Sequence, residues 1–257
     1  MRGPPRWTAG ITTVPQRRES LLPKTISSLK AAGFHELRLF VDGCRDTGDW
    51  EDEFQLPVTA RTTPVRAFGN WILALAELLI RSPDCQRYAL FQDDLVTSRN
   101  LKHYIDSCFR GDTFPQRQYL NLLTWPANQK HATPDPRRQR SQATGWFKAV
   151  HHGYGAVGLV FDRLGVFSLL ANPTTARKPA GLPPRSWANI DGAVWQSLVG
   201  SAPDCERYVE LVHSPSLVDH IGRDSTLVKW QRNMWLDKVV GFRGETFDAM
   251  NFASETV

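Results

Sequence analysis

Two adjacent carboxylates, Asp93 and Asp94, come just after the apolar residues 88–91 and are separated from them only by Gln92. A short apolar run bounded by polar residues is typical of a buried strand. Buried strands of a parallel sheet end at the crevice where ligands bind. Two like charges repel each other there unless a cation neutralises them, and Mg²⁺ and Mn²⁺ prefer carboxylate oxygens. The pair therefore indicates a divalent-cation site, and a solvated Asp-Asp turn is the alternative interpretation.

The segments that must position these carboxylates alternate between strand and helix patterns. The sequence predicts strands at residues 7–13, 37–41 and 58–61 and one ending at Asp93, with helices at 21–30 and 71–80. Gly33 is predicted to close the first helix. This alternation favours an α/β sandwich with a mostly parallel central sheet.

The second half of the chain is less regular. We expect strands at residues 119–123, 153–161 and 208–212, helices at 163–170 and 191–198, and long loops at 124–141 and 172–184. Loops of that length in compact domains are usually functional or mobile.

Composition places the chain among globular proteins. It has 257 residues, of which 41% are hydrophobic and 22% charged. No run of eighteen apolar residues and no apolar leader is seen, so neither a membrane span nor a signal peptide is expected. The four cysteines form no C-x-x-C pair, which argues against a zinc or redox motif. Scattered free thiols favour a reducing, cytoplasmic location.

The net charge of +5 favours anionic partners weakly. Much of the basic charge clusters in one segment, at Lys130, His131, Arg137, Arg138, Arg140 and Lys148. Such a cluster would suit the phosphates of a nucleic acid, and a solvated basic loop is the simpler interpretation.

The ordered set of features resembles GT-A-fold nucleotide-sugar glycosyltransferases of bacterial or phage type. The shared features are Thr12-Thr13, Asp42, Gly69-Asn70, the acidic motif Gln92-Asp93-Asp94, an aromatic-glycine strand, Asp191 on a later helix and a C-terminal histidine within residues 215–222. The motif departs from strict Asp-x-Asp and is similar to a Glu-Asp-Asp variant with its first acid neutralised. The resemblance covers about residues 7–225.

This resemblance implies a three-layer, Rossmann-related sandwich. Residues 1–225 would form the glycosyltransferase domain, with a nucleotide-binding half at about 1–100 and an acceptor half at about 101–225. Residues 226–257 would be an extension packed on that domain. The location would be the cytoplasm of a bacterium or of a phage-infected cell.

The implied activity is metal-dependent transfer of a sugar from a nucleotide-diphosphate sugar, with a UDP-sugar favoured, to an acceptor hydroxyl. A nucleotide diphosphate leaves readily once its charge is balanced, and Mn²⁺ or Mg²⁺ supplies that Lewis-acid function. Strand alternation would turn Gln92 and Asp94 to one side and Asp93 to the other. We therefore expect Asp94 to bind the metal and Asp93 to meet the ribose hydroxyls or a metal-bound water.

The remaining donor-site expectations follow from position. Thr12, Thr13 and Arg17 would contact the base and the phosphates, and Asn70 would contact the nucleotide. Asp42 would bind the uracil imide or a ribose hydroxyl. Gly153 would contact the donor sugar, and Arg223 with Lys229 would contact the departing phosphates. His220 would complete the metal shell, with His213 as its rival. The alternatives are an Asp-Gly turn for Asp42, a structural role for either histidine and surface charges for Arg223 and Lys229.

Inverting transfer needs a general base near the acceptor hydroxyl, and Asp191 is the candidate. A helix N-cap is its competing role, and in a retaining enzyme it would bind sugar hydroxyls instead. Trp146, Tyr154 and Trp187 are candidate stacking platforms, although aromatic residues more often belong to the core.

Two other functions remain open. A nucleotidyltransferase would carry a glycine-rich basic loop after the first strand, but residues 12–18 contain no glycine. A non-catalytic nucleic-acid-binding protein would use the basic cluster, but it would not need the acidic pair. The acceptor is a glycan, a protein side chain or a hydroxymethylated DNA base, and the sequence predicts no oligomeric state.

Overall fold

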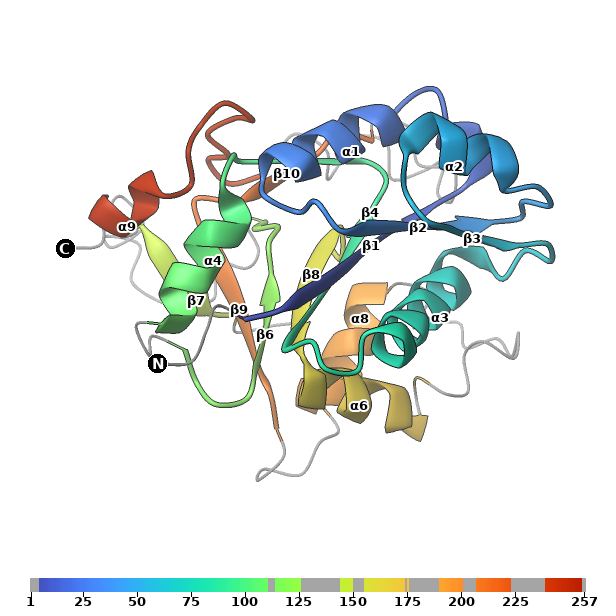
Figure 1. The fold of residues 1–257 in the computed structure, drawn as a ribbon. Helices are drawn as coiled ribbons and strands as arrows, with labels where there is room; N and C mark the ends of the chain where they lie inside the picture. The colour runs from blue at the N-terminus through green and yellow to red at the C-terminus, as the bar shows by residue number, and fades with distance from the viewer. Residues whose placement is uncertain are drawn as a thin grey trace.

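The computed structural model describes residues 5–110, 114–125, 144–149, 155–173, 175, 190–200, 207–222 and 239–255. Its centre is an eight-stranded sheet with strand order β3-β2-β1-β4-β8-β6-β9-β7. Helices cover both faces of this sheet (Figure 1). The predicted three-layer α/β sandwich is therefore confirmed.

The amino-terminal half of the sheet is parallel throughout. It consists of β1 (Trp7–Thr13), β2 (Leu37–Asp42), β3 (Val58–Arg61) and β4 (Arg87–Gln92). Strand β1 lies between β2 and β4, and β3 pairs with β2 at the edge. Because these strands run in one direction, their carboxyl ends meet at one edge of the sheet, where ligands bind in open α/β folds.

The second half of the sheet is mixed. Strand β8 (Gly158–Asp162) lies antiparallel between β4 and β6 (Gln118–Asn121). Strand β9 (Val209–Ser214) is parallel to β6, and β7 (Gly145–Lys148) is antiparallel to β9. Strands β6 and β9 thus run in the direction of β1 to β4, and β7 and β8 oppose them. The sheet is therefore mostly parallel, as predicted.

Each face of the sheet has its own hydrophobic core. One face packs against α1 (Leu22–Ala31), α2 (Gly48–Phe54), α4 (Leu101–Arg110) and α9 (Asn251–Glu255). The other packs against α3 (Arg66–Arg81), α6 (Arg163–Ala171) and α8 (Ile190–Trp195), which continues as a π-helical turn at Gln196–Gly200. Strand alternation divides the residues between them: on β4, Ala89 and Phe91 enter the first core, and Tyr88 and Leu90 enter the second.

A separate two-stranded sheet connects distant parts of the chain. Its strands, β5 (Leu95–Thr97) and β10 (Val218–His220), are antiparallel. Strand β5 follows the acidic pair directly, so this pairing brings residues 220–222 beside Asp94. The turn after β1 contains a short 3-10 helix, η1 (Pro15–Arg17).

The predicted elements are present with small shifts of their ends, whereas several mostly short elements have no predicted counterpart. The strands predicted at 7–13 and 58–61 have those bounds, whereas the one predicted at 153–161 begins at Gly158. The sequence analysis did not predict α2, α4, β5, β7, β10 or α9. Three- to seven-residue elements carry little periodic signal, and tertiary pairing decides whether they form. Helix α4 carried a periodic signal in Leu101, Tyr104, Ile105 and Cys108 that was overlooked.

The last described segment, residues 239–255, packs into the hydrophobic core that contains α1 and α4. Ala249 and Phe252 are fully buried in the cluster that includes α1 and α4. Within the described residues, Cys44, Cys85 and Cys108 form no disulfide bond. In the part of the chain that the structure describes, no helix combines the length and apolarity that crossing a membrane requires.

Candidate active site at the carboxyl edge of the sheet

A pocket of about 180 Å³ lies at the carboxyl ends of β1, β2 and β4. Most of the residues predicted to bind the donor or the metal line it: Thr12, Thr13, Arg17, Asp42, Asn70, Asp93, Asp94 and His220. Val14, Ala67, Gln92 and Ile190 complete the lining. Parallel strand ends, the η1 turn and β10 thus bring residues from distant parts of the chain into one site.

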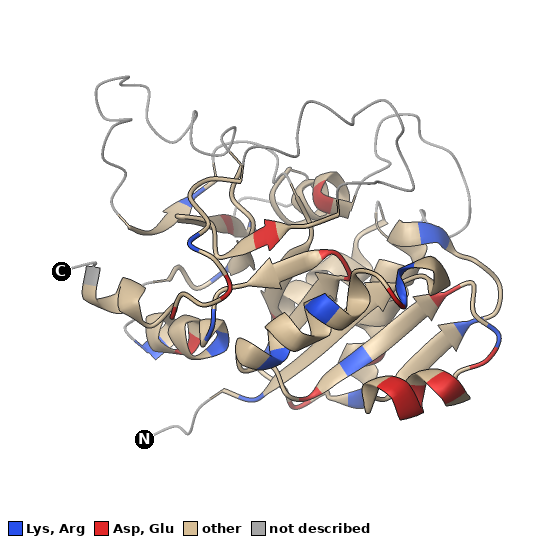
Figure 2. Ribbon diagram, turned by 90° about the horizontal axis from the view of Figure 1, so that it is seen from above, with Lys and Arg blue, Asp and Glu red and all other residues tan. Residues whose placement is uncertain are grey.

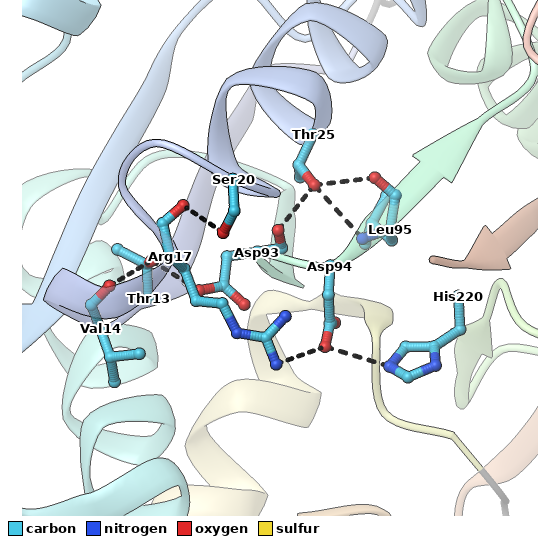
Figure 3. Close-up of polar contacts among 9 residues, drawn as sticks. All are labelled: Thr13, Val14, Arg17, Ser20, Thr25, Asp93, Asp94, Leu95 and His220. Atoms are coloured by element: carbon cyan, nitrogen blue, oxygen red, sulfur yellow. Dashed lines mark hydrogen bonds and ion pairs between the residues drawn. The ribbon is translucent and has the colours of Figure 1, made fainter. Parts of the chain in front are cut away.

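Asp94 stands between two basic side chains (Figure 3). Its Oδ2 lies 3.1 Å from Nε2 of His220 and 3.7 Å from Nη2 of Arg17. Asp94 is 7% exposed, and its Oδ1 is buried with no hydrogen-bond partner among the described residues. A buried carboxylate oxygen without a partner is costly, so this atom is prepared to receive a ligand.

Asp93 is protonated more readily than an ordinary aspartate. It is buried, and Thr13 Oγ1 donates a hydrogen bond of 2.6 Å to its Oδ2 (Figure 3). Burial, followed by the charge of Asp94, raises the pKa of Asp93 to about 6, although the Thr13 hydrogen bond acts in the opposite direction. The negative charge of Asp94 thus makes ionisation of Asp93 less favourable, and a bound cation would offset this effect.

The protonation of His220 depends on its carboxylate partner. Burial alone lowers the pKa of His220, but the hydrogen bond and the charge of Asp94 outweigh burial and raise this pKa above its ordinary value. A divalent cation bound to Asp94 would compete with that proton for the same imidazole nitrogen.

The alternation argument for the acidic motif does not hold. Strand β4 ends at Gln92, and Asp93 and Asp94 lie in the turn that follows, where the two-residue period no longer applies. All three side chains therefore line the same pocket. Gln92 Nε2 donates to the carbonyl of Ala156 at 2.9 Å and so fixes the approach to β8.

Asp42 binds the backbone at the amino-terminal end of α3. Its two carboxylate oxygens accept hydrogen bonds from the backbone N–H groups of Val65 and Arg66, each at 2.8 Å. Asp42 therefore stabilises the start of that helix. Each carboxylate oxygen retains a further lone pair. This structural role is compatible with the predicted contact to a base or ribose.

Asn70 and Thr12 also line the pocket, and both are held by hydrogen bonds. Asn70 Nδ2 donates to the carbonyl of Phe40, and its Oδ1 accepts from Nε of Arg61, both at 2.8 Å. Thr12 Oγ1 donates to the carbonyl of Phe91 at 3.3 Å. These bonds fix the orientation of both side chains, so the pocket wall is formed before any ligand binds.

Asp191 lies in the first turn of α8, next to the pocket-lining Ile190. Its Oδ2 accepts a hydrogen bond of 2.8 Å from the N–H of Gly155, and its Oδ1 accepts one of 3.0 Å from the N–H of Gly192. Gly155 has a φ of 86°, and a Cβ there would clash with the side chain of Leu123. Asp191 itself does not line the pocket; it is half-buried beside it.

The geometry favours His220 over His213 as a metal ligand. His213 is fully buried, with Nε2 2.8 Å from the Tyr104 hydroxyl and Nδ1 2.7 Å from the carbonyl of Pro215. Because a carbonyl only accepts, Nδ1 carries the proton and Nε2 accepts from Tyr104. Trp146, a predicted stacking platform, packs edge-on against His213 with ring centroids 5.1 Å apart. Both residues belong to the packing around α4.

Several predicted residues lie outside the described part of the chain. These are Gly153, Tyr154, Trp187, Arg223, Lys229 and the basic cluster from Lys130 to Arg140. Lys148 is the exposed last residue of β7. Figure 2 shows that the Lys and Arg residues of the described chain are spread over several elements.

Sequence reasoning missed two residues that contact the acidic turn. Gly222 packs so closely that a Cβ there would lie 2.5 Å from Asp94 Oδ2. Thr25 of α1 is fully buried and bonds to the backbone on both sides of Asp94 (Figure 3). Thr25 could have been found as a hydroxyl on the apolar face of a predicted helix, but Gly222 gave no local signal.

Asp94 and His220 are the side chains of the pocket that could bind a divalent cation. Within the described residues, no group of three or more His, Cys, Asp or Glu side chains is arranged to hold a metal. Asp94 and His220 nevertheless present two ligand atoms 3.1 Å apart, close to the separation of about 3 Å between adjacent ligands of an octahedral ion. Two protein ligands fit a metal that takes its other ligands from a diphosphate and water.

Comparisons with known proteins identify the fold. No protein-family model and no curated protein matches the sequence. The structure of GalNAc-T7 with UDP, GalNAc and Mn²⁺ is similar over 93% of this chain and 46% of its own, with 14% identity and a TM-score of 0.53. Staphylococcus aureus TarS 1–349 matches with 10% identity and a TM-score of 0.44 over 79% of this chain and 57% of its own. Mannose-1-phosphate geranyltransferase from Thermus thermophilus matches with 13% identity and a TM-score of 0.42 over 80% of this chain and 73% of its own.

The present chain thus spans about half of GalNAc-T7 and somewhat more of TarS. At these identities the likeness concerns the fold, and function must be argued from the site. The resemblance to GT-A-fold proteins that the sequence predicts is confirmed for the fold: the chain has a GT-A-type fold.

Proposed function

We propose that this protein is a metal-dependent glycosyltransferase that transfers a sugar from a nucleotide-diphosphate sugar, preferably a UDP-sugar, to an acceptor hydroxyl. One observation supports this most directly. Asp94 and His220 converge within 3.1 Å at the carboxyl edge of a parallel sheet, with a guanidinium beside them in the same pocket. That is the arrangement needed to neutralise a diphosphate where it must leave.

Asp94 and His220 would hold the Mn²⁺ or Mg²⁺ ion. The ion, when bound, supplies the Lewis-acid charge that stabilises the departing diphosphate. Arg17, whose side chain is 11% exposed, adds a permanent positive charge directed at the same place. Asp93, held by Thr13, would accept hydrogen bonds from the ribose hydroxyls.

The other wall of the pocket would bind the base. Asp42 retains acceptor capacity beyond its two backbone bonds, which suits an imide N–H such as that of uracil. Asn70 and Thr12 are fixed beside it. The fold neighbour GalNAc-T7 was crystallised with UDP, GalNAc and Mn²⁺, which agrees with a UDP-sugar and Mn²⁺ for this chain. Gly153 and Arg223 keep their predicted roles at the sugar and the phosphates.

Asp191 would serve as the general base in an inverting reaction. It lies beside the pocket rather than in it, where an acceptor would approach the donor sugar. Its two backbone hydrogen bonds orient the carboxylate. If the enzyme retains configuration, the same carboxylate would bind sugar hydroxyls.

The acceptor is a glycan, a protein side chain or a hydroxymethylated DNA base, in the cytoplasm of a bacterium or phage-infected cell. The net charge of +5 is the only observation that supports a DNA acceptor. A gel-shift titration on duplex DNA at several salt concentrations tests it, and the absence of salt-sensitive binding would remove DNA from the candidates. The glycine-free loop after β1 disfavours a nucleotidyltransferase.

The donor proposal is tested by thermal-shift measurements with UDP, GDP and CDP, each with and without Mn²⁺. One diphosphate should stabilise the protein, and only with the metal. At a ligand concentration one hundred times Kd this stabilisation amounts to about 2.7 kcal/mol. Mass spectrometry of donor hydrolysis over a panel of nucleotide-sugars would then identify the sugar. Equal melting temperatures under all conditions would refute the proposal.

A further inference from the structure

The hydroxyl of Thr25 holds the acidic turn from the side of α1. Thr25 is fully buried, and its Oγ1 lies 2.9 Å from the carbonyl oxygen of Asp93 and 2.8 Å from that of Leu95 (Figure 3). The N–H of Leu95 in turn approaches this oxygen at 3.3 Å. The hydroxyl has one proton, so it donates to one carbonyl at a time and accepts from the N–H. These contacts fix the backbone on both sides of Asp94.

The same turn is connected to His220 through the backbone. Leu95 pairs with His220 in the β5–β10 sheet, and the N–H of Ile221 donates to the carbonyl of Asp94 at 2.8 Å. A displacement of Leu95 would therefore move both Asp94, its chain neighbour, and His220, its strand partner. Through Thr25, helix α1 thus contacts the backbone that connects Asp94 with His220.

We propose that Thr25 is a positioning residue for the Asp94–His220 pair and sets its affinity for the divalent cation. This inference rests on the proposed function of the site. Two-ligand metal sites depend on accurate placement, and ligand groups must be held to within about 0.5 Å. Removing a group that orients metal ligands typically lowers metal affinity by about 10- to 100-fold.

The chain provides a matched control one turn further along α1. Ser28 is also buried, and its Oγ accepts a hydrogen bond of 2.8 Å from the N–H of Thr97. It holds the far end of β5, away from Asp94 and from the residue paired with His220. Ser28→Ala therefore removes a comparable buried hydroxyl without releasing the acidic turn.

The experiment compares Thr25→Val, Thr25→Ser and Ser28→Ala with the wild-type protein. Titration of Mn²⁺ at saturating UDP, followed by the electron paramagnetic resonance of free Mn²⁺, gives the metal affinity. Thr25→Val should weaken it by about 10- to 100-fold, whereas Thr25→Ser and Ser28→Ala should stay near the wild-type value. Thermal melting checks that Thr25→Val and Ser28→Ala lose similar stability.

A second measurement needs no metal. Hydrogen exchange in the metal-free protein should show faster exchange at the Ile221 amide in Thr25→Val but not in Ser28→Ala. The positioning role is overturned if wild-type protein binds Mn²⁺ with UDP and Thr25→Val binds it equally well. It is also overturned if Ser28→Ala weakens binding as much as Thr25→Val. Wild-type protein that binds no Mn²⁺ with UDP would refute the proposed function, and this inference with it.

Discussion

Nε2 of His220 lies 3.1 Å from Oδ2 of Asp94, although the two residues come from opposite halves of the chain. The contact follows from the antiparallel register of β5 and β10, in which His220 is opposite Leu95. The three paired residues of β5 and β10 thus join the turn after β4 to the carboxyl-terminal part of the chain. The candidate site exists only when this pairing has formed.

The charge of Asp94 should be needed for ligand binding but not for folding. Asp94→Asn should abolish the Mn²⁺-dependent shift in melting temperature with UDP, because the ion loses its carboxylate. The metal-free protein should still fold, because the amide oxygen can accept from His220 and the loss of the two ion pairs is partly offset by the loss of repulsion on Asp93. Asp84→Asn is the control, because it makes the same charge change at a side chain that is 78% exposed and remote from the pocket. An intact Mn²⁺ response in Asp94→Asn would exclude Asp94 as a ligand.

The imidazole of His220 should make the site prefer Mn²⁺ over Mg²⁺. Imidazole nitrogen suits transition metals, whereas Mg²⁺ prefers oxygen ligands throughout. We expect Mn²⁺ to stabilise the UDP complex more than Mg²⁺ at equal concentration, and His220→Asp to reduce or reverse that preference. His103→Asp, at an exposed position on α4, should leave the preference unchanged. Equal responses to the two metals in the wild-type protein would contradict a role for His220.

Gly222 should tolerate no side chain. A Cβ at this position would lie 2.5 Å from Oδ2 and 2.9 Å from Cβ of Asp94, so the acidic turn or the segment after β10 must shift. Gly222→Ala should weaken Mn²⁺ binding in the presence of UDP by at least about tenfold, as expected when ligand orientation is disturbed. Gly48→Ala is the control, because the nearest atom to its Cβ is 3.6 Å away. Wild-type binding by Gly222→Ala would show that this close packing does not constrain the site.

Asp191 should act on turnover rather than on donor binding. Asp191→Asn keeps an oxygen that can accept the N–H of Gly155 but cannot take up a proton. If Asp191 is the base, kcat should fall by about 10²- to 10⁴-fold while KM for the donor stays unchanged. Asp191→Ala should lose stability as well, because it releases Gly155. If Asp191→Asn turns over at the wild-type rate and Asp191→Ala does not, the residue is structural.

Much of the fold could be predicted from local sequence. Apolar runs and helical spacing identified most of the strands and helices of the first hundred residues, with α2 and β5 as the exceptions, and the parallel order followed from their succession. The same reasoning placed Thr13, Asp42 and Asp93 at strand ends, because the end of a parallel strand is defined by its own residues. Parallel strand ends then share one edge of the sheet, where these residues line one pocket. Their roles in binding stay predictions.

Tertiary structure decided what local spacing could not. His213 and His220 were indistinguishable as sequence, yet one is enclosed beside Tyr104 and the other meets Asp94. Strands β5 and β10 are too short to be recognised alone and exist because they pair. The contacts of Thr25 and Gly222 with the acidic turn likewise depend on how a helix and a distant segment pack. The sequence by itself therefore determined the long elements of the first half and the strand ends at which acids stand, because these depend on local pattern. Long-range packing determined the shortest strands and which basic side chains those acids face.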